Sequence, residues 1–175
     1  MPTHLPSDVP SEVPSEVPSK VNEHSASSSA AVNQAPGFWA EPWFWLSLAA
    51  GLLVWVSLWW LGVPMTTSLN LSLLTFVLSV LVYPVLEEIV FRGWLQEWLL
   101  TFPVMQASKL GFTVANGVTS GIFAAFHLFS QSPLWAASIL FPSLVFGWLR
   151  DRYDSLLPGV LVHMFYNAGL LLLFG

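Results

Sequence analysis

A small set of polar residues lies inside long apolar stretches of this sequence, where charged side chains are costly. They are Glu87, Glu88 and Arg92 in PVLEEIVFRG, His127 in FAAFH, and His163 and Asn167 in HMFYN. A charged side chain at mid-depth in a membrane costs roughly 2.5–3.5 kcal/mol, so such residues indicate either a functional site or a buried structural network. Their occurrence in three separate apolar segments favours a functional site.

These residue types suit the hydrolysis of a peptide bond by an activated water. Water is a poor nucleophile until a base removes its proton, and a glutamate shielded from bulk water is a better base. Glu87 can serve as that base, and His127 can hold the same water. Amide hydrolysis also places negative charge on the carbonyl oxygen, for which His163 and the amide of Asn167 are suitable donors. The sequence contains no cysteine that could act as a thiol nucleophile.

Helical spacing separates the roles of the two glutamates. Glu88 and Arg92 are four residues apart, the spacing of an intrahelical ion pair. The side chain of Glu87 projects about 100° away from that of Glu88. We therefore expect Arg92 to neutralise Glu88 and leave Glu87 free to face a cavity. His163 and Asn167 share the same four-residue spacing and should form one polar stripe.

The composition is that of a membrane protein. The chain of 175 residues is 55% hydrophobic and only 9% charged, whereas soluble domains contain about 25% charged residues. Five Lys and Arg residues, without a basic stripe, exclude a nucleic-acid-binding surface. The absence of cysteine excludes disulfides, iron–sulfur clusters and thiolate zinc sites.

Apolar segments predict an all-α, polytopic membrane bundle of about five transmembrane helices. The predicted spans are residues 43–61, 69–100, 112–129, 134–149 and 156–174. The second span would be on the order of 45 Å long, more than one bilayer core requires. Pro84 should kink it and free a backbone carbonyl just before the glutamates.

The first 37 residues differ from the rest of the chain. They contain a Pro-Ser-x-Val repeat followed by a stretch rich in Ser and Ala, without apolar periodicity. Such a composition cannot bury a core. We therefore predict a disordered tail over residues 1–37 and a transmembrane domain over residues 38–175; the tail could also dock a partner protein.

Basic residues predict the orientation of the chain. With five spans, Lys20, Lys109, Arg150 and Arg152 fall on one side of the membrane. The positive-inside rule then places the N-terminus in the cytoplasm and the C-terminus outside.

Measured from the cytoplasmic ends of their spans, the polar residues lie at similar depths. Glu87, His127 and Asn167 fall at roughly 20, 22 and 16 Å, and His163 at roughly 10 Å. The three spans can therefore bring their polar residues to one level.

The three motifs, in this order and spacing, resemble those of the CPBP family of intramembrane endopeptidases, the CAAX-protease and bacteriocin-processing group. EEIVFRG resembles its Glu-Glu-x-x-x-Arg motif, FAAFH its Phe-x-x-x-His motif and HMFYN its His-x-x-x-Asn motif. The resemblance implies a glutamic-type endopeptidase of a prokaryotic plasma membrane that acts on a membrane-associated peptide or protein. It implies catalytic roles for all the polar residues named above, with substrate contacts from Phe91 and Phe123.

Three alternatives remain open at the level of the sequence. Glu87, His127 and His163 could form a two-His, one-carboxylate zinc site, although we expect no cofactor. The same polar residues could be a proton relay in a small transporter. They could also belong to a non-catalytic binding or immunity scaffold. Because the chain has fewer spans than longer family members, a partner protein or an oligomer could complete the substrate enclosure.

Overall fold

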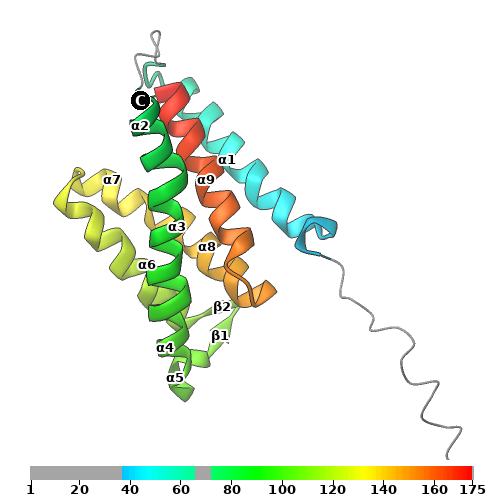
Figure 1. The fold of residues 1–175 in the computed structure, drawn as a ribbon. Coiled ribbons are helices and arrows are strands. Elements are labelled where there is room, and N and C mark those ends of the chain that lie inside the picture. The colour runs from blue at the N-terminus through cyan, green and yellow to red at the C-terminus, as the bar shows by residue number, and fades with distance from the viewer. Residues whose placement is uncertain (1–36, 66–71, 175) are drawn as a thin grey trace, which may run out of the picture. The chain divides into compact units, whose positions relative to one another are not determined.

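The computed structural model describes residues 37–65 and 72–174, and these form an all-α bundle (Figure 1). Within them, four helices are long and apolar enough to cross a membrane: Pro42–Trp60, Leu73–Leu100, Pro133–Tyr153 and Leu157–Phe174. The remaining predicted span corresponds to the shorter apolar segment Val114–Phe129. The predicted fold class of a polytopic membrane bundle is therefore confirmed. The predicted tail lies, apart from Gly37, outside the described residues.

The first long helix and the helix that carries the two glutamates precede a short hairpin. In chain order the elements are η1 (Phe38–Ala40), α1 (Pro42–Trp60), α2 (Leu73–Phe76), η2 (Val77–Val82), α3 (Tyr83–Glu88), η3 (Ile89–Gln96), α4 (Glu97–Leu100), α5 (Pro103–Gln106), β1 (Ser108–Lys109) and β2 (Phe112–Thr113). Elements α2 to α4 form one continuous helix, in which η2 and η3 are wider π-helical segments. Such π-helical turns are frequent at functional sites.

The second half of the chain supplies the histidine-bearing helices. Its elements are α6 (Val114–Phe126), η4 (His127–Phe129), α7 (Pro133–Ser138), α8 (Leu140–Tyr153) and α9 (Leu157–Phe174). The predicted third span began at residue 112, but Phe112 and Thr113 pair with β1 as a hairpin strand. The α6 helix starts at Val114, directly after Thr113. The Thr113 hydroxyl accepts a hydrogen bond from the backbone N–H of Asn116 and caps the helix.

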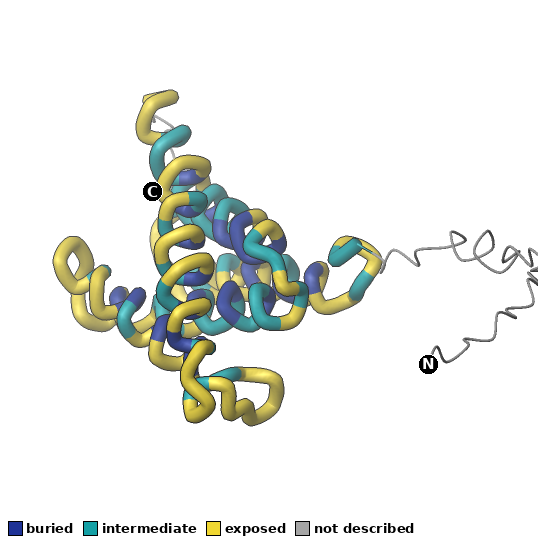
Figure 2. The backbone as a smooth tube through the Cα atoms, turned by 60° about the horizontal axis from the view of Figure 1, so that its bottom comes forward, coloured by how far each residue is buried: buried dark blue, intermediate teal, exposed yellow. Residues whose placement is uncertain are grey.

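The bundle buries several polar side chains among its apolar core and exposes many apolar ones. Its fully buried side chains include Glu88, Arg92, Gln96, Asn116 and Ser143. The exposed surface of the helices carries large apolar side chains, such as those of Leu53, Trp60, Leu73, Trp94 and Phe141. Figure 2 shows buried positions concentrated where helices face one another. A soluble protein would not expose such a surface to water, so this distribution fits a helix bundle surrounded by lipid.

Helices α1 and α9 approach each other closely through two glycines. The ring of Tyr166 on α9 occupies the space where Gly51 lacks a side chain, and the indole of Trp55 on α1 does the same at Gly169. The Tyr166 hydroxyl also donates to the backbone carbonyl of Ser47, at 2.5 Å. Small residues at helix contacts are a common device in membranes, where close packing replaces the hydrophobic effect as the source of association.

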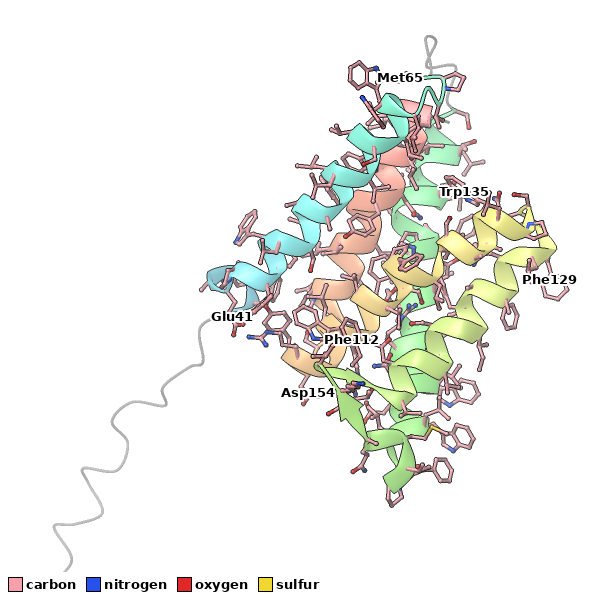
Figure 3. All side chains as sticks on the ribbon, turned by 180° about the vertical axis from the view of Figure 1, so that it is seen from behind. Glu41, Met65, Phe112, Phe129, Trp135 and Asp154 are labelled. Carbon is pink, nitrogen blue, oxygen red and sulfur yellow. The ribbon has the colours of Figure 1, made fainter. Side chains whose placement is uncertain are left out.

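Three segments that the sequence placed on one side of the membrane lie at one end of the bundle. Arg152 at the end of α8 donates two hydrogen bonds to Glu41, just before α1, at 2.8 and 3.1 Å. The hydroxyl of Thr113, the last residue of the hairpin strand β2, donates to Asp151 at 2.8 Å. Figure 3 shows Met65, which follows α1, at the opposite end from Glu41. Glu41, Thr113 and Arg152 therefore lie at one end of the bundle, and Met65 lies at the other end of α1.

Candidate active site

The predicted ion pair between Glu88 and Arg92 is present and buried. Nη1 of Arg92 lies 3.2 Å from Oε1 of Glu88, and the two side chains are 0% and 1% exposed. Removing charges from water is expensive, and the mutual attraction repays that cost only with further hydrogen bonds. The surroundings of Arg92 provide them.

Arg92 is held on the side away from Glu88 by α8. Its Nη2 donates to the backbone carbonyl of Ser143 at 2.9 Å and to the hydroxyl of the same residue at 2.5 Å. The guanidinium also lies over the ring of Phe123, 4.6 Å from its centroid, and 5.5 Å from that of Phe146. A cation over an aromatic face is stabilised by the ring quadrupole. Glu88 and Arg92 therefore connect the glutamate helix to α6 and α8.

His163 on α9 lies between the two glutamates. Its Nδ1 is 3.0 Å from Oε1 of Glu88, and its Nε2 is 3.5 Å from Oε2 of Glu87. An ionised carboxylate can only accept hydrogen bonds. Nδ1 therefore carries a hydrogen and donates a hydrogen bond to Glu88. The imidazole stacks on Phe146 with a centroid distance of 4.5 Å and an interplanar angle of 17°. The Glu87 side chain itself is 32% exposed.

His127 lies at the end of α6 with its ring fixed by its own helix. Nδ1 is 2.9 Å from the backbone carbonyl of Phe123, one turn earlier. A carbonyl oxygen only accepts, so Nδ1 holds the proton. In the neutral ring, Nε2 is then left with a lone pair that can accept a hydrogen bond from water. The ring of Phe123 packs 4.8 Å from that of His127, which is the aromatic wall expected from their spacing.

Both histidines line an apolar cavity of about 660 Å³. Its walls come from α1, α6, α7, α8 and α9, and include Trp55, Trp135 and Phe141. Phe123 lines the cavity, whereas Phe91 packs behind it with a ring-centroid distance of 4.9 Å. Glu87 is not among the lining residues and reaches the cavity through its contact with His163. A cavity of this size and character suits an apolar group.

Asn167 is engaged away from the glutamates. Its Nδ2 donates to the backbone carbonyl of Ser79, in η2, at 3.0 Å. The structure thus brings His163 to Glu87 and Glu88, while Asn167, one turn further along α9, contacts the preceding part of the glutamate helix. The depth estimate had placed Asn167, and not His163, at the level of Glu87.

Several buried polar residues were not predicted from the sequence. Gln96 follows Glu88 and Arg92 on the same face of the helix, and its amide donates to the carbonyl of Gly147 at 3.0 Å and to Asp151 at 2.7 Å. Ser143, Gly147 and Asp151 repeat at the same four-residue spacing on α8. Polar and small residues recur every four positions in each of these two helices. This shared spacing is the sequence signal that could have identified the contact.

The described residues contain no group of three or more His, Asp or Glu side chains arranged to hold a metal ion. The predicted alternative zinc ligands Glu87 and His163 approach each other, but both nitrogens of His163 face carboxylates. Nδ1 of His163 contacts Glu88, as in the carboxylate–histidine pairs of zinc sites, and its Nε2 faces Glu87. Glu87, His163, Glu88 and Arg92 thus form a chain of contacts between ionisable groups.

Residues 68–169 match the model of a family described as type II CAAX prenyl endopeptidase Rce1-like. The match covers more than half of the chain and includes the three sequence motifs with their six polar residues, whereas the α1 wall of the cavity lies outside it. Comparison with curated proteins and with solved structures gives no significant match.

Proposed function

Because the chain belongs to the Rce1-like family of type II CAAX prenyl endopeptidases, we propose that it cleaves a peptide bond in a membrane-associated substrate with a water activated by Glu87 and His127. The chain is an integral membrane protein of a protease family. The observation that carries the finer proposal is the contact of His163 with both glutamates beside an apolar cavity.

The charges of the candidate site balance when His163 is protonated. Glu87 and Glu88 then contribute two negative charges, and Arg92 and His163 two positive ones. An electroneutral cluster is the least costly arrangement of ionised groups inside a membrane. In this state Glu87 is an ionised carboxylate that can accept a proton, and Nε2 of His163 carries a hydrogen directed at it.

The proposed reaction begins with a water between Glu87 and Nε2 of His127. Glu87 takes a proton from the water, and the resulting hydroxide adds to the carbonyl carbon of the scissile bond. The carbonyl oxygen becomes an oxyanion, to which the Nε2 hydrogen of His163 can be donated. The carbon–nitrogen bond then breaks, and Glu87 returns its proton to the leaving nitrogen. Glu88 and Arg92 hold His163 and the helix in place.

The cavity supports a lipid-modified or otherwise apolar substrate. The family description names a prenylated CAAX substrate, and the walls formed by Trp55, Trp135 and Phe141 suit an isoprenoid chain. We therefore propose a peptide whose modified cysteine enters the cavity while its backbone passes His127 and His163. We propose further that the reaction needs no metal, because Glu87 can supply the base and His163 the oxyanion donor.

The test is cleavage by the full chain in liposomes of an internally quenched peptide that ends in farnesyl-cysteine and three further residues. We expect release of the terminal tripeptide, slower cleavage of the same peptide without the farnesyl group, and no loss of rate with 1,10-phenanthroline. Mass spectrometry of the products identifies the cleaved bond. Loss of activity with the chelator and recovery with zinc would establish a metal enzyme instead. Absence of cleavage of both peptides would favour the scaffold or transporter interpretation.

We also propose that the end of the bundle that contains Glu41, Thr113 and Arg152 faces the cytoplasm of a prokaryotic cell. The basic residues at this end motivate the proposal. A reporter fused to a chain truncated after Arg152 should be cytoplasmic, and one fused after Gly175 should be external. Alkaline phosphatase and green fluorescent protein fusions measure the two locations. Two reporters on the same side would contradict five crossings.

A further inference from the structure

The carbonyl oxygen of Ser79 loses the backbone partners that a helix normally offers. In an α-helix its partner would be the N–H of Tyr83, but this group donates to Leu78 because η2 is π-helical. In a π-helix the partner would be the N–H of residue 84, and Pro84 has none. Ser79 is half-buried, and a carbonyl without a partner in the apolar part of a membrane costs several kcal/mol, so the site requires another donor.

Asn167 supplies that donor. Its Nδ2 lies 3.0 Å from the Ser79 carbonyl oxygen, across the contact between η2 and α9. Asn167 lies one helical turn after His163, which binds Glu88 and contacts Glu87. The two contacts fix α9 against the glutamate helix at two points, one on each side of Pro84. Pro84 is itself fully buried between these two points.

We propose that Asn167 is a positioning residue, which replaces the backbone hydrogen bond that Pro84 removes and thereby sets the position of Glu87 relative to His163. The expected effect on kcat rests on the proposed function, whereas the effect on the position of Glu87 relative to His163 does not. Asn167 thereby has a task besides that of the oxyanion donor expected from the sequence, because one of the two hydrogens of its amide is committed to the protein backbone.

A double-mutant cycle separates the two roles. Pro84→Ala restores an N–H to the helix, which can pair with the preceding turn and reduce the need for Asn167. In the wild-type background, Asn167→Ala should lower kcat by about 10²-fold, as a misplacement of about 1 Å can do, with little change in KM. In the Pro84→Ala background, the same substitution should lower kcat by no more than about tenfold. An oxyanion donor would instead give the same loss in both backgrounds.

Asn116→Ala is the matched control for this cycle. Asn116 is also buried and donates to a backbone carbonyl, that of Leu144, at 3.0 Å. No proline lies four or five residues after Leu144. The effect of Asn116→Ala on kcat should therefore be the same with and without Pro84. If Pro84→Ala reduced the effects of both asparagine substitutions equally, the specific link to Asn167 would be overturned.

A distance measurement tests the proposal without any substrate. The chain contains no cysteine, so nitroxide labels can be attached at Leu86→Cys and Leu161→Cys alone. Both positions are exposed. Leu86 precedes Glu87 directly, and Leu161 lies two residues before His163. Pulsed electron paramagnetic resonance should show a shifted or broadened distance distribution for Asn167→Ala, restored in the Pro84→Ala background. A distribution unchanged by Asn167→Ala would overturn the proposal, even if the protein cleaved no peptide.

Discussion

Glu87→Gln should reduce peptide cleavage by at least about 10²-fold, the lower end of what a general base contributes, while the protein accumulates in the membrane as the wild type does. The substitution keeps the shape of the side chain and removes the proton acceptor. Little stability should be lost, because the Glu87 side chain is one-third exposed and its ion pair with His163 spans 3.5 Å. Initial rates of cleavage in liposomes and thermal unfolding in detergent measure the two quantities.

Glu97→Gln is the matched control for Glu87→Gln. Glu97 lies on the same continuous helix and pairs with Arg150, but its side chain is 57% exposed. Arg150 is only 13% exposed but also contacts Asp151 and Asp154, so the substitution should change neither stability nor rate appreciably. Cleavage by Glu87→Gln at the rate of the control would rule out Glu87 as the base. His127→Ala would then show whether the other side of the cavity activates the water.

The local part of the site could be predicted from the sequence. Glu88 and Arg92 pair because four residues along a helix bring side chains together, and no tertiary information is needed. The aromatic wall that Phe123 gives His127 follows from the same spacing. Pro84 was expected to free a backbone carbonyl just before the glutamates, but the carbonyl that accepts from Asn167 is that of Ser79, eight residues before Glu87. Each of these expectations concerns one helix.

The contacts between helices could not be predicted in the same way. Whether His163 or Asn167 meets Glu87 depends on the register of α9 against the glutamate helix, and four residues shift that register by about 6 Å. Depth along the membrane was too coarse to decide between them. The π-helical segments η2 and η3 change the direction of each following side chain, and no residue pattern indicates them. Ser143 and Asp151 were missed because a single hydroxyl or a carboxylate near a helix end does not indicate a buried contact.

Glu88→Gln should destabilise the protein far more than Glu87→Gln. Glu88 is 1% exposed and is the ion-pair partner of the fully buried Arg92. Removing one member of a buried pair leaves the other charge uncompensated, at a cost of about 3–5 kcal/mol. His163 also loses its charged acceptor at Nδ1. We expect a fall of about 10 °C in the thermal midpoint, less protein in the membrane, and loss of cleavage.

The double variant Glu88→Gln with Arg92→Met separates the cost of the stranded charge from the role of the pair in the reaction. Met fills much of the volume of Arg92 without its charge, and neutral replacement of a buried ion pair is often tolerated. The thermal midpoint should therefore recover most of the loss, although the hydrogen bonds from Arg92 to Ser143 are absent. Cleavage should not recover, because His163 still lacks the carboxylate that orients it and balances its charge. A double variant no more stable than Glu88→Gln would show that the stranded guanidinium is not the source of the instability. Full recovery of cleavage would show that the pair serves the fold alone.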